Sequence, residues 1–365
     1  QIAQRWTEFL DLFVAKRIPE IPPVARALVP GTIEGVFGGP LEFDDDRLAD
    51  AASYEEALEQ FREDPRYTLL MEAGYGLPDN PGVAEPTFEI ESDEWPVPGV
   101  EATTLYLQPE GLLGPDEPTA ADDDDGAMVT YAQDPGQADQ VTLPGDAVGD
   151  AFAALPPYEW NQPEEGSLAS WTTEPLEEDT TLVGPSRADL WLASTAEDTD
   201  VEVTITEVRE DGTEFLVQSG WQRASARALD EERSDELHAV PTFQAGDNAQ
   251  LTPGELVEVS VQIFPATHVF RAGSSIRITV DSPGGNRPRW EFDTLEQDGE
   301  TNTIALSADH PSRLTLGILP GVDAPADLPV CPSLRAQPCR TLEPVENELA
   351  DEGDPSQTED PADAA

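Results

Sequence analysis

Hydrophobic and polar residues alternate along most of the second half of the chain. The alternation is clearest at 188–192, 201–205, 257–263, 276–280, 304–306 and 314–318. A period of two is typical of strands that bury one face. Asp211 and Gly212 form a pair that suits a hairpin turn between two of these strands. We therefore expect about seven or eight strands and few helices, which predicts a mainly β fold, a β-sandwich of the jelly-roll type.

The N-terminal region follows a different pattern. Apolar residues recur every three or four positions between residues 3 and 17, which predicts a helix. Residues 18–50 show no sustained period and are rich in Pro, Gly and Asp, so we expect an irregular excursion there. Ser53 and Glu56 form a capping box in front of a second helix, predicted over 54–63. The apolar run at 67–71 is typical of a strand buried in a parallel sheet.

The remaining segments carry weaker patterns. Residues 108–182 predict long loops with isolated strands, such as 103–107 just before them and 128–131 within them. From residue 343 the chain contains Glu, Asp, Pro, Ala and Ser with almost no large apolar residue, so we expect a disordered acidic tail over 343–365.

The excess of acidic residues limits the kinds of molecule that this chain can bind. The chain has 75 acidic and 19 basic residues, a net charge of −56, and its one lysine is Lys16. Nucleic acid and anionic membrane surfaces are therefore poor partners. The acidity suits a surface that stays soluble in concentrated salt, and it equally suits an arginine-favouring genome with acidic loops. No run approaches the roughly 18 apolar residues that span a bilayer, so we expect no membrane span.

The chain contains two cysteines, Cys331 and Cys339. Two thiols without a nearby histidine do not complete a four-ligand zinc site, so a local disulfide is the better interpretation. A disulfide implies an oxidising compartment, and we predict a secreted protein. The chain begins at Gln1 with neither an initiator Met nor a signal peptide, which we interpret as a fragment or a processed product.

We find no catalytic residue in the sequence. The G-x-S-x-G elbow that exposes a nucleophilic serine is absent, because Gly273–Ser275 precede a strand and Gly166 with Ser167 lies in a loop. The candidate bases are the three histidines, His238, His268 and His310, and none has a Ser or Cys motif beside it. We therefore expect each to make structural hydrogen bonds, and we predict no cofactor.

Acidic runs and tryptophans offer two weaker hypotheses. The runs at 122–126 and 197–200 carry carboxylates suited to calcium, but neither has the EF-hand spacing, and solvated acidic loops are the simpler interpretation. Trp191, Trp221 and Trp290 suit a sugar-stacking platform, although large aromatics at strand spacing are more often core.

Two stretches resemble a known family. Residues 184–227 contain a strand ending in Ser194 and Thr195, the loop Asp198–Asp200, and the turn at Asp211 and Gly212. This order, and the stretch IFPATHVFRAGSSIRITVDSPGGNRPRW, resembles the C-terminal galactose-binding-like jelly-roll domain of X-Pro dipeptidyl-peptidases and cocaine-esterase-like (CocE/NonD) serine hydrolases. Upstream, EFLDLFVAKRIP resembles the helix after the catalytic histidine of these hydrolases, RYTLLMEAG the strand that follows, and WPVP at 95–98 a family Trp-Pro.

The resemblance implies a division of the chain. Residues 1–90 would be the last elements of an α/β-hydrolase domain, 95–325 the jelly-roll domain, 326–342 a disulfide loop and 343–365 the tail. The family's Ser, Asp and His precede the first helix, so no catalytic residue is carried over, and the implied partners are the chain's own upstream hydrolase domain and a small peptide or ester substrate. The alternative is a non-catalytic extracellular β-sandwich that binds carbohydrate or protein.

Overall fold

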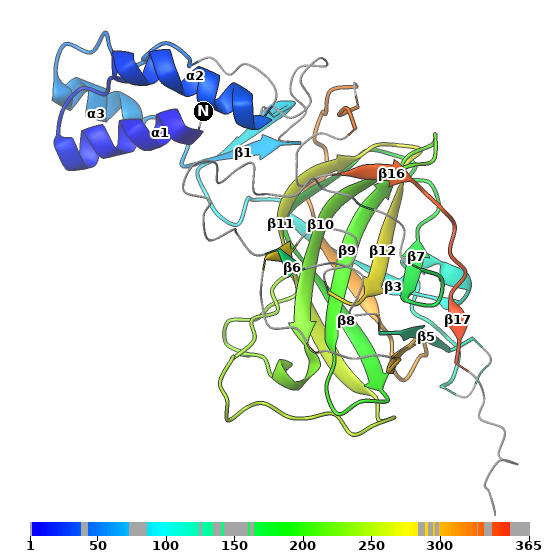
Figure 1. Cartoon of the computed structure of the whole chain (residues 1–365). Coiled ribbons are helices and arrows are strands. Elements are labelled where there is room, and N and C mark those ends of the chain that lie inside the picture. The colour runs from blue at the N-terminus through cyan, green and yellow to red at the C-terminus, as the bar shows by residue number, and fades with distance from the viewer. Residues whose placement is uncertain are drawn as a thin grey trace, which may run out of the picture.

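Two antiparallel sheets form the larger part of the molecule (Figure 1). The computed structural model describes residues 2–37, 43–72, 86–122, 124, 126–133, 140–141, 160, 164–283, 289–290, 295, 299–326, 328–331 and 338–350. One sheet has the order β16 (Cys339–Thr341), β10 (Thr213–Arg223), β9 (Asp200–Val208), β12 (Ser275–Asp281), β7 (Leu168–Thr172). The other has the order β17 (Glu348–Leu349), β5 (Met128–Ala132), β14 (Thr301–Ala305), β8 (Thr180–Ser194), β15 (Arg313–Ile318), β3 (Glu101–Leu107), β4 (Leu113–Gly114), and β11 (Val257–Phe270) also pairs with β8.

The core lies between the two sheets. Inward-facing residues of both sheets form one cluster in which Tyr131, Trp171, Phe215 and Phe270 are the largest fully buried side chains. Burying this much apolar surface is the main contribution to the stability of such a sandwich. The prediction of a mainly β fold with a β-sandwich is confirmed, as is the hairpin turn at Asp211 and Gly212, which joins β9 to β10.

β8 is the organising strand of the larger sheet. One edge of β8 pairs with β14 and β15 and the other edge pairs with β11 along nearly its whole length. Most of its 15 residues are buried, so the alternation seen in the sequence does not translate into one exposed face. The reason is that loop residues, including 234–239, cover part of its outer face.

The N-terminal helices form a separate small cluster. α1 (Ile2–Phe9) continues into a π-helical turn, Leu10–Ala15, and α3 is Tyr54–Arg62, so both predicted helices are confirmed. The Ser53 hydroxyl accepts a hydrogen bond from the Glu56 backbone N–H at 3.2 Å, as the capping box predicts. Leu12, Leu48 and Ala57 meet in the centre of this cluster.

The expected irregular excursion over 18–50 is wrong in its central part, where α2 (Pro23–Phe37) forms. Pro23 occupies the first helical position, where a proline is tolerated because that N–H would have no partner in the helix. Pro30 lies inside the helix. Arg26 binds Asp46 at 2.8 Å and so ties α2 to the segment that follows.

The strand predicted at 67–71 is present as β1 (Tyr67–Met71), but its expected parallel environment is wrong. β1 pairs antiparallel with β2 (Phe88–Ser92) in a two-stranded sheet. Leu69 and Met71 pack against Val183 and Val269 of the sandwich. Alternate residues of β1 are therefore buried on one face, and the other face points away from the sandwich.

The C-terminal segment is partly ordered. Cys331 and Cys339 form the predicted disulfide, with Cα atoms 5.8 Å apart, and β16 starts at Cys339. Residues 343–350 are also described and end in β17, which corrects the disordered tail predicted from residue 343. Asn347 explains the difference, because its side chain bonds both the N–H and the C=O of Ser170 at 2.8 and 2.9 Å. Residues 351–365 lie outside the described residues.

The remaining elements are short. They are the 3₁₀ turns η2 (Pro109–Gly111) and η4 (Ala224–Ala226), and the parallel pair β6 (Gln140–Val141) and β13 (Arg289–Trp290). Among the helices that the structure describes, none is both long and apolar enough to cross a membrane.

Candidate functional site

A polar cavity lies on the outer face of the larger sheet. This cavity of about 730 Å³, called here the Asp189 basin, spans β3, β8, β11 and β15 and is walled by the segment 227–236. Its charged lining residues are Arg187, Asp189, Arg227, Glu231, Asp235, Glu236, Glu258 and Arg313.

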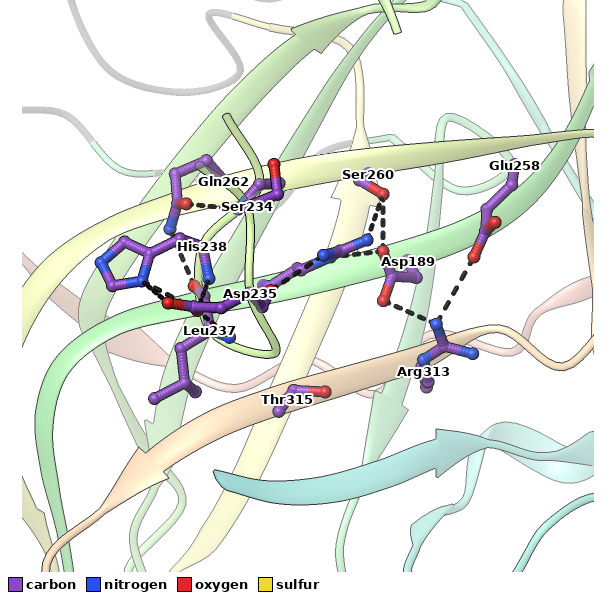
Figure 2. A network of polar contacts seen from close by, with 12 residues as sticks. Asp189, Ser234, Asp235, Leu237, His238, Glu258, Ser260, Gln262, Arg313 and Thr315 are labelled. Atoms are coloured by element: carbon purple, nitrogen blue, oxygen red, sulfur yellow. Dashed lines mark hydrogen bonds and ion pairs between the residues drawn. The ribbon is translucent and has the colours of Figure 1, made fainter. Parts of the chain in front are cut away.

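Asp189 is the centre of the basin, and strand register explains its partners (Figure 2). Residue 189 of β8 lies directly opposite Ser260 of β11 on one side and opposite Arg313 of β15 on the other. The Ser260 hydroxyl donates to Asp189 Oδ1 at 2.6 Å, and Arg313 Nη2 lies 3.0 Å from Oδ2. Arg187, two residues earlier on the same face of β8, donates from Nε to Oδ1 at 2.7 Å.

Asp189 is 3% exposed, so its charge depends on these partners. Two guanidinium groups and a hydroxyl compensate for the water that the carboxylate loses on burial. Arg313 also reaches Glu258 at 3.4 Å, near the solvent. The network therefore holds three strands in one register and presents a rigid polar floor.

A loop over 234–239 forms one side of the basin and is fixed to the sheet by side chains. Arg187 Nη1 donates to the Asp235 carbonyl at 3.0 Å. The Gln262 side chain donates to the carbonyls of Ser186 and Leu237 at 2.9 and 3.3 Å, and accepts from the Ala239 N–H at 2.8 Å. The loop is thus held in place before any ligand arrives.

Within this loop Asp235 and His238 form a pair. The His238 ring Nδ1 lies 2.9 and 3.0 Å from the two Asp235 oxygens, and Oδ1 also accepts from the backbone N–H groups of Leu237 and His238. Partial burial alone would raise the pKa of the Asp235 carboxyl, but these hydrogen bonds and the nearby His238 charge outweigh it and lower that pKa. The carboxylate holds Nδ1, so Nε2 is the ring atom left to meet a ligand.

A second, apolar cavity lies on the other side of the same loop. This cavity of about 360 Å³, called here the Trp95 hollow, shares Ala102, Asp235 and Glu236 with the basin. Its other lining residues are Trp95, Pro96, Val97, Val100, Val183, Gly184, Pro185, Leu237 and His238.

The other two candidate histidines also bind carboxylates. His268 is buried, and its Nε2 lies 3.1 Å from Glu207 Oε2. His310 Nδ1 lies 2.8 Å from Asp122 Oδ2, and the Ser307 hydroxyl donates to the same carboxylate. Ser307 and His310 side chains both bond Asp122 rather than each other, so this group does not have the Ser–His–Asp order of a hydrolase. The structural interpretation fits all three rings.

The acidic runs have structural partners too. Asp198 Oδ1 accepts from the backbone N–H groups of Thr199 and Ser225 at 2.9 and 2.8 Å. Asp200 holds Arg223 through two hydrogen bonds of 2.8 and 2.9 Å. Among the described residues, which leave out Asp123 and Asp125, no group of three or more His, Cys, Asp or Glu side chains could hold a metal.

The proposed tryptophan platform does not assemble from the described residues. Trp191 meets the His310 ring edge-on at 4.6 Å, and Trp221 meets Phe264 edge-on at 5.5 Å. The side chain of Trp290 lies outside the described residues. Among the described residues, exposed tryptophans at cavities are instead Trp6 and Trp95, 60% and 47% exposed, and the sequence marked Trp95 only through the WPVP resemblance.

Sequence reasoning missed the Asp189 network. Asp189 occupies a polar position of an alternating strand, which predicts an exposed carboxylate. Its three partners come from β8, β11 and β15, and pairing between distant strands is invisible to periodicity. The available signal was weak: polar or charged residues at matching positions of several strands.

Comparison with known proteins shows which family the chain belongs to. The model of the X-Pro dipeptidyl-peptidase C-terminal non-catalytic domain matches residues 60–315. This chain belongs to that family. The match covers the β1–β2 pair and most of the sandwich, including both cavities. The resemblance inferred from the sequence motifs is confirmed.

Curated relatives are hydrolases of greater length. The chain is 25% identical over 234 residues to a putative serine esterase of Mycobacterium bovis, covering 62% of this chain and 35% of the relative. It is 25% identical over 246 residues to cocaine esterase of a Rhodococcus species, covering 63% and 39%. The chain thus spans little more than a third of the length of these relatives.

Two hydrolases are among the solved structures that this chain matches. A CocE/NonD family hydrolase from Staphylococcus aureus matches with a TM-score of 0.49 and 19% identity, covering 64% of this chain and 39% of that one. An α-amino acid ester hydrolase matches with a TM-score of 0.46 and 18% identity, covering 72% and 45%.

Proposed function

We propose that this chain is the C-terminal region of a secreted serine hydrolase that cleaves an acyl bond of a small peptide or ester. The catalytic Ser, Asp and His belong to an α/β-hydrolase domain upstream of Gln1 in the same polypeptide. That domain forms an acyl-enzyme on its serine, and this chain, as a jelly-roll domain, helps to wall the substrate pocket.

The observation that carries this proposal is the family match combined with the share of the relatives that the chain covers. The matched family is a non-catalytic domain, and the relatives that contain the matching region are named as esterases. The rest of each relative, well over half of its length, is where a catalytic domain would lie. The disulfide at Cys331 and Cys339 supports the secreted localisation.

An apolar face at the N-terminus supports a large intramolecular partner. Trp6, Phe9 and Phe13 stack along α1 and the turn after it, with ring centroids 5.8 and 4.9 Å apart, and are 60%, 41% and 41% exposed. A cavity of about 610 Å³ lies beside Trp6 and Phe9. A contiguous exposed apolar face marks an interaction site, and the upstream hydrolase domain is the partner we assign to it.

The division of the chain stays part of the proposal. Residues 1–90 as the end of the hydrolase domain and 95–325 as the jelly-roll domain agree with the separate helical cluster and the sandwich. The family match begins at residue 60 and β1 packs on the sandwich, so β1 associates with the jelly-roll domain.

Labelling with a serine-reactive fluorophosphonate tests the proposal. The chain alone and a longer polypeptide, made from the coding sequence extended upstream of Gln1 in the same reading frame, are treated in parallel. We expect a stoichiometric adduct on the longer polypeptide only, at a serine that precedes Gln1. Hydrolysis of p-nitrophenyl esters and of Xaa-Pro p-nitroanilides then distinguishes an esterase from a peptidase.

A stoichiometric adduct on the isolated chain contradicts the proposal, and so does an upstream extension that encodes no nucleophile elbow. In the second case the non-catalytic binding module becomes the better interpretation, and binding to a glycan array is its direct test.

A further inference from the structure

The Trp95 hollow combines apolar walls with carboxylates. Val97 and Val183 are 7% and 2% exposed and form its floor, while the indole of Trp95 stands beside them. Asp235 and Glu236 lie at its edge. No lysine or arginine is among the described residues that line it, in contrast to the Asp189 basin, which three arginines line.

The hollow is built by an irregularity in β8. Pairing with β11 skips between Ile263 and Ala266, and pairing with β15 skips between Leu316 and Ile318, both opposite the stretch around Gly184. Gly184 takes a φ of +98°, which favours glycine. The regular pairing of β8 is thus interrupted where Trp95 and the 234–239 loop line the hollow.

The walls keep their places without a ligand. Leu237 is held through its carbonyl by Gln262, and Asp235 is fixed by three N–H groups of its own loop (Figure 2). Val97, Val183 and Val100 belong to the cluster that joins β1 to the sandwich. A site that is already formed binds without an ordering cost.

The charged residues that line the hollow determine which kind of ligand it can bind. Asp235 is ionised and bound to His238, and the exposed Glu236 has no ion-pair partner among the described residues. Because Asp235 already binds His238, Glu236 is the carboxylate left for a ligand, and an apolar hollow with an aromatic face and this carboxylate complements a cation that carries an apolar group. Arg187 donates to the backbone of Asp235 from the basin side, so its charge does not line the hollow.

We propose that the Trp95 hollow binds a primary ammonium group carried on a short aromatic or aliphatic chain. The apolar chain lies on Val97, Val183 and Leu237, and the ammonium group reaches Glu236 beside the indole of Trp95. This inference rests on the hollow alone, so it holds or fails independently of the proposed acyl hydrolase.

Titration calorimetry on this chain with three ligands of similar size tests the site. The ligands are 2-phenylethylammonium, the neutral 2-phenylethanol and the anionic phenylacetate, all at one fixed ionic strength. We expect the ammonium compound to bind most tightly and phenylacetate to bind least. Removing the charge in Glu236→Gln weakens ammonium binding about fivefold, and Trp95→Ala weakens it to a similar degree.

Matched variants show whether the ligand binds because of this site or because of the negative charge of the whole protein. Glu231→Gln removes the same charge from the basin side only and leaves ammonium binding unchanged. Trp95→Phe keeps an aromatic face and retains most of the affinity, which distinguishes loss of the ring from loss of the fold.

Three results overturn the proposal. They are equal affinity for the three ligands, an equal effect of Glu236→Gln and Glu231→Gln, and no heat of binding for 2-phenylethylammonium at about 10 mM, the weak limit for a ligand of this size.

Discussion

Several buried carboxylates in this chain are paired with buried cations. The pairs join Glu207 to His268 and Arg209, Glu214 to Arg277 and Arg340, and Glu72 to Arg271. Such pairs are weak evidence for added stability, because desolvation opposes the attraction, but breaking one leaves a charge buried without compensation. With 75 acidic residues against 19 basic ones, most carboxylates have to be solvated, and Arg209, Arg271, Arg277 and Arg340 pair with buried ones.

Glu207 gives a prediction at this scale. Burial alone would raise its pKa, but the His268 hydrogen bond and the charges of His268 and Arg209 outweigh burial and lower the pKa to about 2, from 4.5. The folded-state pKa is the lower one, so this carboxylate stabilises the fold fully above about pH 4.5. That contribution is lost as pH falls through about 2.

Urea unfolding of wild type and Glu207→Gln across this pH range measures the effect. At pH 7 we expect the variant to lose roughly 3 kcal/mol in free energy of unfolding, because His268 and Arg209 lose their partner. The difference between the two proteins should shrink toward pH 2. Glu210→Gln, an exposed acid close by in sequence, serves as the control and should change little. A constant difference across pH would contradict the assignment.

Strands β10 and β11 approach each other closely at Gly220. They belong to opposite sheets, and a Cβ at Gly220 of β10 would lie 2.7 Å from Gln262 C and 2.9 Å from Ile263 Cα, with Gln262 O nearer still. These are backbone atoms, so they cannot move aside as a side chain would. The packing of one sheet on the other therefore requires glycine at this position.

Gly220→Ala should destabilise the sandwich by about 1–3 kcal/mol, because the added methyl group separates the sheets locally. Thermal unfolding followed by circular dichroism measures the change. Gly246→Ala is the matched control, since a Cβ there meets nothing within 4 Å and its φ is not in the left-handed region. Equal unfolding temperatures for the two variants would show that the sheets are not in contact at Gly220.

The elements that the sequence predicted well are those with a sustained local signal. The Ser53 capping box placed α3, and alternating apolar residues placed β9, β11 and β12. The missed helix α2 has prolines at its start and interior, which local rules penalise, although its Arg26 contact with Asp46 favours it in the folded chain. Tertiary contacts override propensity in such segments.

On the scale of the whole molecule, net charge dominates. A net charge of −56 means that the folded surface repels itself, and salt screens this repulsion within about 3 Å at 1 M. We expect the unfolding temperature to rise as KCl is raised from about 0.1 to about 1 M and above.

A matched series in sucrose at equal water activity separates screening from solvent exclusion, because sucrose carries no charge. Stabilisation by KCl well beyond that by sucrose supports a surface adapted to high salt. An unfolding temperature that stays level or falls with KCl contradicts that adaptation and leaves the arginine-favouring genome with acidic loops as the explanation.

The sequence by itself determined the properties that depend on residues close to one another in the chain. These are the strand periodicity of the sandwich, the disulfide of Cys331 and Cys339, the acidic surface and the family, because each is carried by residues that are near one another in the chain. The order of motifs along the chain was enough to assign the family.

Only the tertiary structure decided which distant segments meet. In the folded chain β1 pairs antiparallel with β2, and Asn347 binds Ser170 and so holds the segment 343–350 in place. Asp189 is enclosed between Ser260 and Arg313. The pairing of β8 is also interrupted around Gly184, where Trp95 and Glu236 line one hollow. The physical reason is that pairing register and burial by loops depend on contacts across long sequence separations, which a local pattern does not contain.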